Sequence, residues 1–355
     1  MTKTVQTAIV GVTGYAGAEL ARLLLHHPRL QGKPPVFAGR VEGKDLERGG
    51  IPLAEIHPQL GDNNGSSELK LEPFSWELLS ERGVDVLFQA TPHGISREVI
   101  PIALSRGIRV IDLSGAWRLT DAANRAVYAF ADEGSEPAAA TQAQAVYGMP
   151  ELHRKQIAGA RLVANPGCYA TSIILPLKPL VAAGLIDLER GIVADAKSGV
   201  SGAGKAPTAK THFMYAADNL SAYGVFAHRH TGELLEQIGI SSAEIIFTPH
   251  LLPIPRGILS TIYVRFKNAQ TRESVAEVYR DFFAGSPMVR FYEKALPQIQ
   301  YSVHTNYADI GFQLDANGKR AVIVSCLDNL LKGAAGQAVQ NFNLIAGWPE
   351  SEGLA

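Results

Sequence analysis

The first 120 residues alternate short apolar segments with segments of helical periodicity. The helical segments lie at 17–27, where Leu20, Leu23 and Leu24 share one face, and at 96–106. The apolar runs between and around them predict strands at 6–10, 35–38, 84–89 and 108–113. Strands that alternate with helices in this way predict a parallel sheet with helices on both faces.

The pattern changes in the middle of the chain. Residues 120–145 are rich in Ala, Asp and Gln with little periodicity, which predicts a loop-rich connection. After Pro166 the sequence predicts helices at 169–181, 272–283 and 329–345, and strands at 192–196, 243–248, 259–266 and 321–325. We therefore expect an α/β chain in three parts: a nucleotide-binding type of domain at 1–165, an α+β domain at 166–327, and a C-terminal helix at 328–355 that returns to the first domain.

Composition excludes several classes of protein. The chain has 355 residues and a formal net charge of -1, so no basic excess is available to hold a nucleic acid or an anionic membrane. A signal peptide and a run of eighteen apolar residues are both missing, which predicts a cytoplasmic protein that does not cross a membrane. The two cysteines, Cys168 and Cys326, exclude a disulfide framework and a multi-cysteine metal site, and we expect no metal.

A glycine-rich turn follows the first predicted strand and opens the first predicted helix. Glycines at this place let backbone N–H groups approach a dinucleotide pyrophosphate, and the helix N-terminus adds partial positive charge. The spacing is GxxGxxG and not the common GxGxxG, so a tight turn that binds nothing is the alternative. We expect cofactor contacts from Gly11, Thr13, Gly14, Tyr15, Ala16 and Gly17.

The end of the second predicted strand bears on the choice of cofactor. Sites for NAD usually place Asp or Glu there to hold the ribose 2′-hydroxyl, whereas this strand ends in Ala38-Gly39-Arg40. A guanidinium suits a 2′-phosphate, so Arg40 favours NADP(H), although an arginine in a surface loop is the plain alternative.

A second glycine-rich segment, residues 199–205, matches the GxxxxGK spacing of a P-loop. Ala206 stands where that motif needs Ser or Thr for Mg²⁺, which argues against a kinase or ATPase. Backbone N–H groups of such a segment can still wrap a nicotinamide or a substrate.

Cys168 lies in the segment NPGCYAT at 165–171, immediately before a predicted helix. A thiol at a helix N-terminus has its thiolate stabilised, so we expect a lowered pKa and a nucleophile. Most free cysteines are small buried apolar residues, and Cys326, at the end of the run AVIVSC, fits that description.

A cysteine nucleophile needs an acid/base partner. The cluster His228-Arg229-His230 precedes a predicted helix start and makes a poor core element, so we expect His230, with His228 second, to be that partner. A solvated loop or a subunit contact is the alternative, and His93, His212 and His250 also flank turns.

Together these segments resemble the N-acetyl-γ-glutamyl-phosphate reductases of arginine biosynthesis. The resemblance covers nearly the whole chain in order. It rests on GVTGYAGAEL at 11–20, TPHGIS at 91–96, DLSGAWRL at 112–119, YGMPEL at 147–152, NPGCYAT at 165–171, KSGVSGAGK at 197–205, HRHTGE at 228–233, TPHLLPIPRGILST at 248–261 and DNLLKGAAGQAVQN at 328–341. Two places depart from the family pattern: the family usually has Ala-Asp/Glu-Phe/Tyr-Arg where this chain has Gly115-Ala116-Trp117-Arg118, and HRHTPE where Gly232 stands here.

The resemblance implies a fold and a reaction. The fold is a Rossmann NADP-binding domain with a glyceraldehyde-3-phosphate-dehydrogenase-like α+β catalytic domain. The reaction is reduction of an acyl phosphate by NADPH through a Cys168 thioester, with His230 as acid/base, in a homotetramer or homodimer. The site residues that it implies are Arg118, Asn165, Arg256 and Ser114 for the substrate, and Ser198, Gly199, Gly202 and Asn329 for the cofactor.

Other interpretations remain open from the sequence. Aspartate-semialdehyde dehydrogenases and the homologous reductase of lysine biosynthesis share the chemistry and the cofactor. A non-catalytic NADP(H)-binding sensor and a cysteine hydrolase that uses Cys168 and His230 are alternatives from other classes.

Overall fold

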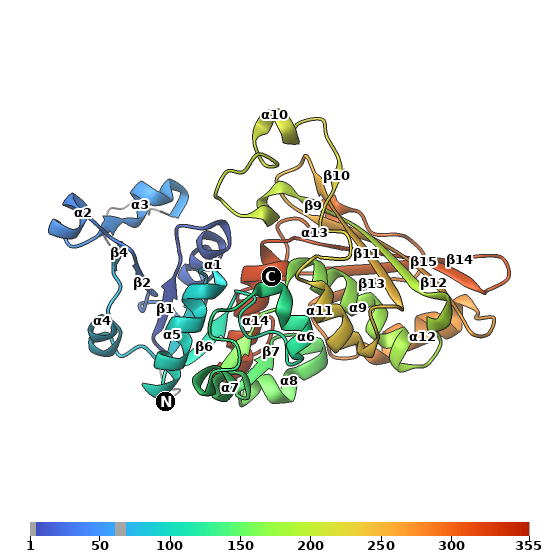
Figure 1. Cartoon of the computed structure of the whole chain (residues 1–355), viewed down its shortest axis with the longest axis horizontal. Helices are drawn as coiled ribbons and strands as arrows, with labels where there is room; N and C mark the ends of the chain where they lie inside the picture. The colour runs from blue at the N-terminus through green and yellow to red at the C-terminus, as the bar shows by residue number, and fades with distance from the viewer. Residues whose placement is uncertain (1–4, 61–68, 355) are drawn as a thin grey trace.

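The computed structural model describes residues 5–60 and 69–354. Residues 1–4, 61–68 and 355 lie outside the described residues, and they include the first residues of the predicted range 1–165 and the last residue of the predicted range 328–355. Two sheets stand side by side, one built by the first half of the chain and one by the second half (Figure 1).

The first sheet has eight strands within the described residues, in the order β3-β4-β2-β1-β5-β6-β8-β7. Neighbouring strands are parallel except for the antiparallel pair β3 and β4. The strands are β1 (Thr7–Val10), β2 (Val36–Gly39), β3 (Ile51–Pro52), β4 (Lys70–Pro73), β5 (Val86–Gln89), β6 (Arg109–Asp112), β7 (Ala145–Tyr147) and β8 (Leu162–Ala164). The helices of this half are α1 (Tyr15–Leu25), α2 (Lys44–Glu47), α3 (Leu53–Ile56), α4 (Trp76–Glu81), α5 (His93–Ser105), α6 (Ala122–Arg125), α7 (Glu136–Gln142) and α8 (Pro150–Ala158).

The second sheet is mixed and has seven strands among the described residues, in the order β10-β11-β9-β12-β15-β14-β13. Its strands are β9 (Ile192–Gly199), β10 (Ser221–Ala222), β11 (Ile245–Leu252), β12 (Ile258–Arg265), β13 (Val289–Tyr292), β14 (Ala308–Leu314) and β15 (Arg320–Leu327). The helices that accompany it are α9 (Cys168–Ala182), α10 (Phe213–Ala216), α11 (Thr231–Leu234), α12 (Arg272–Phe282) and α13 (Ile299–Ser302).

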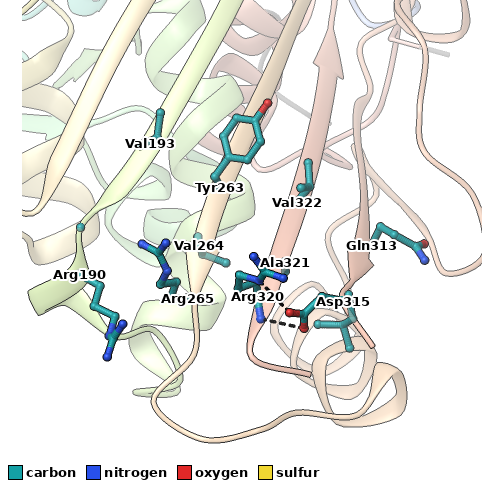
Figure 2. A pocket seen from close by; sticks show the side chains of 12 residues that line it. Arg190, Val193, Tyr263, Val264, Arg265, Gln313, Asp315, Arg320, Ala321 and Val322 are labelled. Atoms are coloured by element: carbon teal, nitrogen blue, oxygen red, sulfur yellow. Dashed lines mark hydrogen bonds and ion pairs between the residues drawn. The ribbon is translucent and has the colours of Figure 1, made fainter. Parts of the chain in front are cut away.

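One face of the second sheet carries an exposed apolar row. Ile246 pairs with Val193, Val193 with Tyr263, and Tyr263 with Val322 on successive strands, so the four side chains form one line across the sheet. Ile246, Val193 and Tyr263 are 45%, 39% and 46% exposed, which is unusual for apolar side chains on strands. Figure 2 shows Val193, Tyr263 and Val322 beside a hollow of about 510 Å³ at one end of this face. We call this surface the open face.

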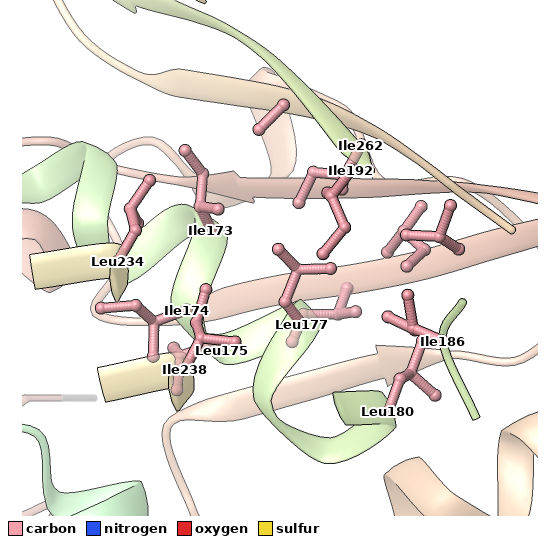
Figure 3. Close-up of a cluster of buried hydrophobic side chains, with 14 of the residues drawn as sticks. Ile173, Ile174, Leu175, Leu177, Leu180, Ile186, Ile192, Leu234, Ile238 and Ile262 are labelled. Carbon is pink, nitrogen blue, oxygen red and sulfur yellow. The ribbon is translucent and has the colours of Figure 1, made fainter. Parts of the chain in front are cut away.

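The opposite face of the second sheet packs on α9 and forms the largest core. Ile173 and Leu177 of α9 lie against Ile192 and Ile262 of the strands, and all four side chains are fully buried (Figure 3). Nearly every side chain of α9 is buried, so this helix is fixed along its whole length, including its first residue.

The chain returns to the first domain at its C-terminal end. A π-helical turn, Leu331–Ala335, leads into α14 (Gly336–Ala346). Val339 and Phe342 of α14 are fully buried in the core that contains Leu20 and Leu24 of α1. The predicted fold class, with a C-terminal helix that rejoins the nucleotide-binding type of domain, is therefore confirmed.

Several elements differ from the sequence prediction. Residues 120–145 contain α6 and α7, whose first turns are capped by the side chains of Asp121 and Ser135. These helices are too short to produce a readable apolar period. Strands β3, β4, β7, β8, β13 and β14 and helix α4 were not predicted, and the predicted helix 329–345 begins with a π-helical turn. No helix among the described residues is long and apolar enough to span a membrane.

Candidate active site

Cys168 stands at the junction between the two sheets. Strand β8 ends at Ala164, and α9 begins at Cys168 after the tight segment 165–167. Gly167 is the N-cap residue, in extended conformation, so Cys168 occupies the first helical position. Cys326, by contrast, is fully buried within β15.

A cavity of about 440 Å³ opens beside the thiol. Its walls come from the start of α9, the end of β9 and the long segment between β9 and α11. Among the predicted site residues, those that line it are Cys168, Ser198, Gly202, His228 and His230.

His230 lies directly against the residue that precedes the thiol. A side-chain carbon at Gly167 would come within 2.5 Å of two His230 ring atoms, so only glycine fits there. The His230 backbone N–H donates to His228 Nδ1 at 3.1 Å, and the two rings lie 4.7 Å apart. The structure therefore brings the predicted nucleophile and both predicted acid/base residues together.

The protonation states differ from the sequence expectation. Burial raises the pKa of the Cys168 thiol, and the Tyr169 N–H and the charges of Arg229 and Arg118 oppose this effect without overcoming it. The predicted lowering of this pKa by the helix N-terminus is therefore wrong for the unliganded chain, because desolvation of the thiolate outweighs the helix dipole.

Both histidines are neutral near pH 7 in this structure. Burial, together with the charge of Arg229, lowers the pKa of His228 to about 4. Burial also lowers the pKa of His230 well below its ordinary value, assisted by His228, Arg118 and Arg229. The resting pair is consequently a thiol beside a neutral imidazole.

Glu233 contacts several residues around the thiol, and the sequence analysis did not predict it as a site residue. Its fully buried carboxylate accepts hydrogen bonds from Gly167 N at 2.9 Å, Tyr147 Oη at 2.7 Å and Arg118 Nη1 at 3.1 Å. The same carboxylate lies 4.0 Å from His230 Nε2. The signal available in the sequence was its position three residues after His230, which places both side chains on one helical face.

Three of the predicted substrate residues, Arg118, Asn165 and Ser114, are buried, and their polar groups form hydrogen bonds within the protein. Arg118 donates to Glu233, to the Asn165 carbonyl at 2.7 Å and to the Leu113 carbonyl at 3.0 Å. The Asn165 side chain donates to the Ala334 carbonyl and accepts from Asn341. Ser114 Oγ donates to Asp112 and accepts from Ala116 N.

Arg256 lies on the cofactor side of the junction. It forms ion pairs with Glu19 of α1 at 2.6 Å and with Asp328 at 3.0 Å, and thereby ties the two domains together. The structure does not place Arg256 on the wall of the cavity beside Cys168, whose lining is described above.

Two cations line this cavity, Lys210 and Arg229, and Arg229 is the one that lies between the two histidines. Arg229 is exposed, and no described residue forms a hydrogen bond or an ion pair with its guanidinium. The sequence analysis noted it only as the residue between the two histidines. The signal available in the sequence was the position of this charged side chain between two candidate catalytic residues.

The glycine turn after β1 has the geometry that a dinucleotide requires. Gly11 has φ +101°, and a side-chain carbon there would lie 2.3 Å from the Ala90 carbonyl oxygen. A carbon at Gly17 would lie 2.1 Å from the Gly11 oxygen, whereas Gly14 meets only one atom, at 3.7 Å. Gly11 and Gly17 thus permit close packing of α1 on the turn, while Gly14 leaves its open side accessible to a ligand.

The end of β2 is consistent with a charged cofactor. Arg40 follows Gly39, the last residue of β2, and its side chain is 85% exposed, with Glu42 as its ion-pair partner among the described residues at 2.6 Å. Such an exposed pair is weak, so the guanidinium is free to turn to another anion.

The predicted nicotinamide segment is assembled by long-range contacts. Asn329 accepts from Gly257 N at 2.7 Å and donates to Ser201 Oγ at 2.9 Å. A carbon at Gly202 would lie 3.0 Å from Ser198 Oγ and 3.7 Å from Asn329 Nδ2. A carbon at Gly199 would lie 2.8 Å from the Arg256 N atom, so the start of this loop is closely packed.

The two departures from the family pattern have different surroundings. A side-chain carbon at Gly115 would meet the Tyr128 ring at 2.4 Å, so glycine at this position follows from the packing of Tyr128. At Gly232 a side-chain carbon would lie 3.0 Å from atoms of Asn124 and Leu119, a tight but less severe contact.

Two family descriptions match consecutive parts of the chain. "Semialdehyde dehydrogenase, NAD binding domain" matches residues 6–160, and "Semialdehyde dehydrogenase, dimerisation domain" matches residues 168–329. Aspartate semialdehyde dehydrogenase II of Vibrio cholerae, complexed with ASA, superposes with TM-score 0.68 at 18% identity, covering 97% of this chain and 99% of that one. The Candida albicans aspartate semialdehyde dehydrogenase with NADP has TM-score 0.66 at 16% identity, with 96% and 98% covered. These structures share the fold.

Sequence relatives are closer. N-acetyl-gamma-glutamyl-phosphate reductase of Dehalococcoides mccartyi strain CBDB1 is 43% identical, covering 99% of this chain and 98% of the relative. The proteins of that name from Geobacillus stearothermophilus and Methanococcus maripaludis strain C5 are 43% and 40% identical, each covering 98% of this chain and 97% of the relative. The chain therefore belongs to the N-acetyl-gamma-glutamyl-phosphate reductase family.

Proposed function

We propose that this chain reduces N-acetyl-γ-glutamyl phosphate with NADPH, giving N-acetylglutamate 5-semialdehyde and phosphate, as a step of arginine biosynthesis in the cytoplasm. The observation that carries the proposal is the site itself. Cys168 begins a rigid helix, His230 lies against the residue before it, and the free cation of Arg229 lines the same cavity. The family of the chain supports the same reaction.

The protonation states support activation by the substrate. The resting pair is a thiol and a neutral imidazole, so His230 is ready to accept the thiol proton. A dianionic phosphate in the cavity raises the pKa of the His230 imidazole, which makes this ring a stronger base for the thiol proton. The thiolate of Cys168 thus forms when the acyl phosphate is in place and attacks its carbonyl carbon.

Proton transfer through His230 balances the reaction. The proton from Cys168 passes to the departing phosphate, which leaves as HPO₄²⁻ while a thioester remains on Sγ. A proton from solvent then recharges His230, which protonates the alkoxide formed by reduction. His230 takes this proton back as the carbon–sulfur bond breaks and the aldehyde leaves, and it finally reprotonates the thiolate.

Arg229 binds the substrate anion in this proposal. Its guanidinium has donors to offer, whereas those of Arg118 are largely used by Glu233, Asn165 and Leu113. Arg118 then adds fixed positive charge behind the thiol. Direct contacts of Asn165, Arg256 and Ser114 with substrate stay predictions, since each has internal partners in the unliganded chain.

NADP(H) is the cofactor that these residues fit. The turn from Gly11 to Gly17 would hold the pyrophosphate, Arg40 the 2′-phosphate, and Ser198 and Gly202 the nicotinamide end. When bound, the nicotinamide supplies the hydride that reduces the thioester carbonyl. The hydrogen bond from Asn329 to Ser201 Oγ would hold the segment 199–205 beside that end.

We further propose that the chain is a homodimer, or a homotetramer built from such dimers, and that the open face is an interface between copies. The match to a dimerisation domain includes every strand of the second sheet, and the apolar row from Ile246 to Val322 is exposed on the isolated chain.

The test of the reaction is direct observation of the acyl enzyme. Incubation with the acyl phosphate, without NADPH, should add the acyl mass to one peptide containing Cys168, and NADPH should then release the semialdehyde. A Cys168→Ser variant is the control and should form no such adduct. Turnover without any Cys168 adduct contradicts the mechanism.

Companion assays separate the remaining alternatives. Phosphate-dependent reduction of NADP⁺ is measured with the semialdehydes of N-acetylglutamate, N-acetylaminoadipate and aspartate. Turnover of only a non-acetylated substrate would reject the substrate proposed here. Unchanged activity in Cys168→Ala would leave a nucleotide-binding protein that does not use this thiol.

A further inference from the structure

Lys205 is a cation that the proposed mechanism does not use. It ends the segment with P-loop spacing, yet no P-loop forms. Strand β9 ends at Gly199, and the chain continues as a short 3₁₀ turn, Val200–Ala203, before Gly204, which has φ +89°. In a P-loop the lysine would serve the phosphates on its own loop, so Lys205 needs another explanation.

The side chain of Lys205 reaches the glycine turn of the other domain. Its Nζ donates to the Thr13 carbonyl oxygen at 3.2 Å, across 192 residues of sequence. Thr13 immediately precedes Gly14, the N-cap residue of α1. The ammonium of the second domain therefore lies at the turn where the first domain is built to receive a pyrophosphate.

The surroundings of this ammonium favour an anion. Lys205 lines a cavity of about 590 Å³ together with Tyr15 and Ala18 of α1 and Ser201. The first turn of α1 contains no acidic residue, and no side chain caps its N–H groups. Thus the open backbone donors and the lysine share one cavity.

The one carboxylate of α1 that lines this cavity is already neutralised. Glu19 pairs with Arg256 at 2.6 Å and with Arg22 at 3.0 Å. An incoming phosphate group would therefore not meet an unpaired negative charge there.

The cavity also adjoins the active site. Thr211 lines both this cavity and the one beside Cys168. A cofactor bound at Lys205 would therefore lie next to the cavity that contains the thiol.

We infer that Lys205 binds the cofactor pyrophosphate and closes the second domain onto the glycine turn of the first. This inference rests on the proposed use of NADP(H) and adds a cofactor-binding residue that the sequence analysis did not name. Lys205 is exposed, and its present bond to a single carbonyl is readily exchanged for a charge-assisted bond to phosphate.

The test measures binding of the nucleotide and not activity. Purified Lys205→Met, Lys205→Arg and wild-type chains are titrated with NADPH and with NADH, followed by nicotinamide fluorescence. Both nucleotides carry the pyrophosphate, so Lys205→Met should weaken both by the same factor, about tenfold. Lys205→Arg should restore most of the affinity, and the salt dependence of binding should be smaller for Lys205→Met.

Two further variants sharpen the result. Arg40→Ala should weaken NADPH and leave NADH unchanged, because only NADPH has the 2′-phosphate. Lys155→Met, at an exposed lysine of α8, is the matched control for the loss of a positive charge and should bind both nucleotides as wild type does.

The remaining outcomes distinguish a failure of this inference from a failure of the proposed function. Unchanged affinity of Lys205→Met beside a wild type that binds NADPH overturns the inference and leaves the proposed function standing. A loss confined to NADPH also overturns it, since Lys205 would then contact the 2′-phosphate. A wild type that binds neither nucleotide contradicts the proposed function itself.

Discussion

At the scale of single residues, the guanidinium of Arg229 acts on both the thiol and the histidines of the site. Arg229 opposes the burial that raises the pKa of Cys168, and it adds to the burial that lowers the pKa of His228 and His230. A positive charge favours the thiolate and disfavours the imidazolium, so both effects have the same electrostatic cause. Arg229 also has no internal partner among the described residues, which leaves it available to an anionic substrate.

Replacement of Arg229 should therefore make Cys168 less reactive in the unliganded protein. In Arg229→Ala the pKa of the thiol rises further, so the thiolate fraction at pH 7.5 falls and alkylation by iodoacetamide slows by about 3- to 10-fold. The rate should still increase with pH up to the alkaline range, and its profile should shift to higher pH. Arg190→Ala, which removes an exposed arginine paired with Asp187, is the control. Equal alkylation rates in Arg229→Ala and wild type would show that this charge does not act on the thiol.

At the scale of elements, the position of Cys168 is fixed from two directions. Behind it, α9 is buried along nearly its whole length. Beside it, the π-helical turn Leu331–Ala335 brings Gly333 so close that a side-chain carbon there would lie 2.7 Å from Cys168 Cβ. The buried ion pair of Lys332 with Glu151, at 2.7 Å, anchors this turn to α8. A π-helical turn of this kind is often found at functional sites.

An added methyl group at Gly333 should consequently displace the thiol. Gly333→Ala is expected to lower kcat by about 10- to 100-fold, because small displacements of a nucleophile are costly. The strain should also reduce the free energy of unfolding by about 1–3 kcal/mol. Gly159→Ala serves as the control, since a carbon at Gly159 meets only one atom, at 4.0 Å. Turnover and urea unfolding are measured on both variants, and a fully active Gly333→Ala enzyme would exclude this positioning role.

At the scale of the whole molecule, the second sheet uses its two faces differently. One face packs on α9 and supports the active site, whereas the open face presents the row Ile246, Val193, Tyr263 and Val322. The first domain closes its own core through α14, so it does not cover this row. A second copy of the chain would bury the row symmetrically, because residues on a twofold interface occur in pairs.

A charge placed on the open face should separate the copies. Ile246→Glu is expected to weaken self-association by at least about 100-fold, since each interface would bury two unpaired carboxylates. Ile102→Glu is a matched control, because Ile102 is 43% exposed on α5 and Ile246 is 45% exposed on the open face. Sedimentation velocity across a range of concentrations gives the oligomeric state of both variants. An Ile246→Glu chain that associates as wild type does would assign the interface to another surface.

Local sequence patterns were sufficient to predict the features that depend on neighbouring residues along the chain. The glycine turn, the alternating strands and helices and the place of Cys168 at a helix start were predicted because glycine spacing, apolar period and helix starts are local properties. The short elements in 120–145 were missed because side-chain caps stabilise them, and strands β13 and β14 were missed because pairing with neighbouring strands stabilises them.

Packing between distant segments sets which charged groups face the thiol and which are held in internal hydrogen bonds. Arg118 and Asn165 are committed to partners across 115 and 176 residues of sequence, while Arg229 stays free, and no local pattern contains that distinction. The same holds for the raised pKa of Cys168, the bond of Lys205 to Thr13 and the exposed row on the open face. Burial and long-range proximity are properties of packing, so they arise only when distant segments of the chain are brought together.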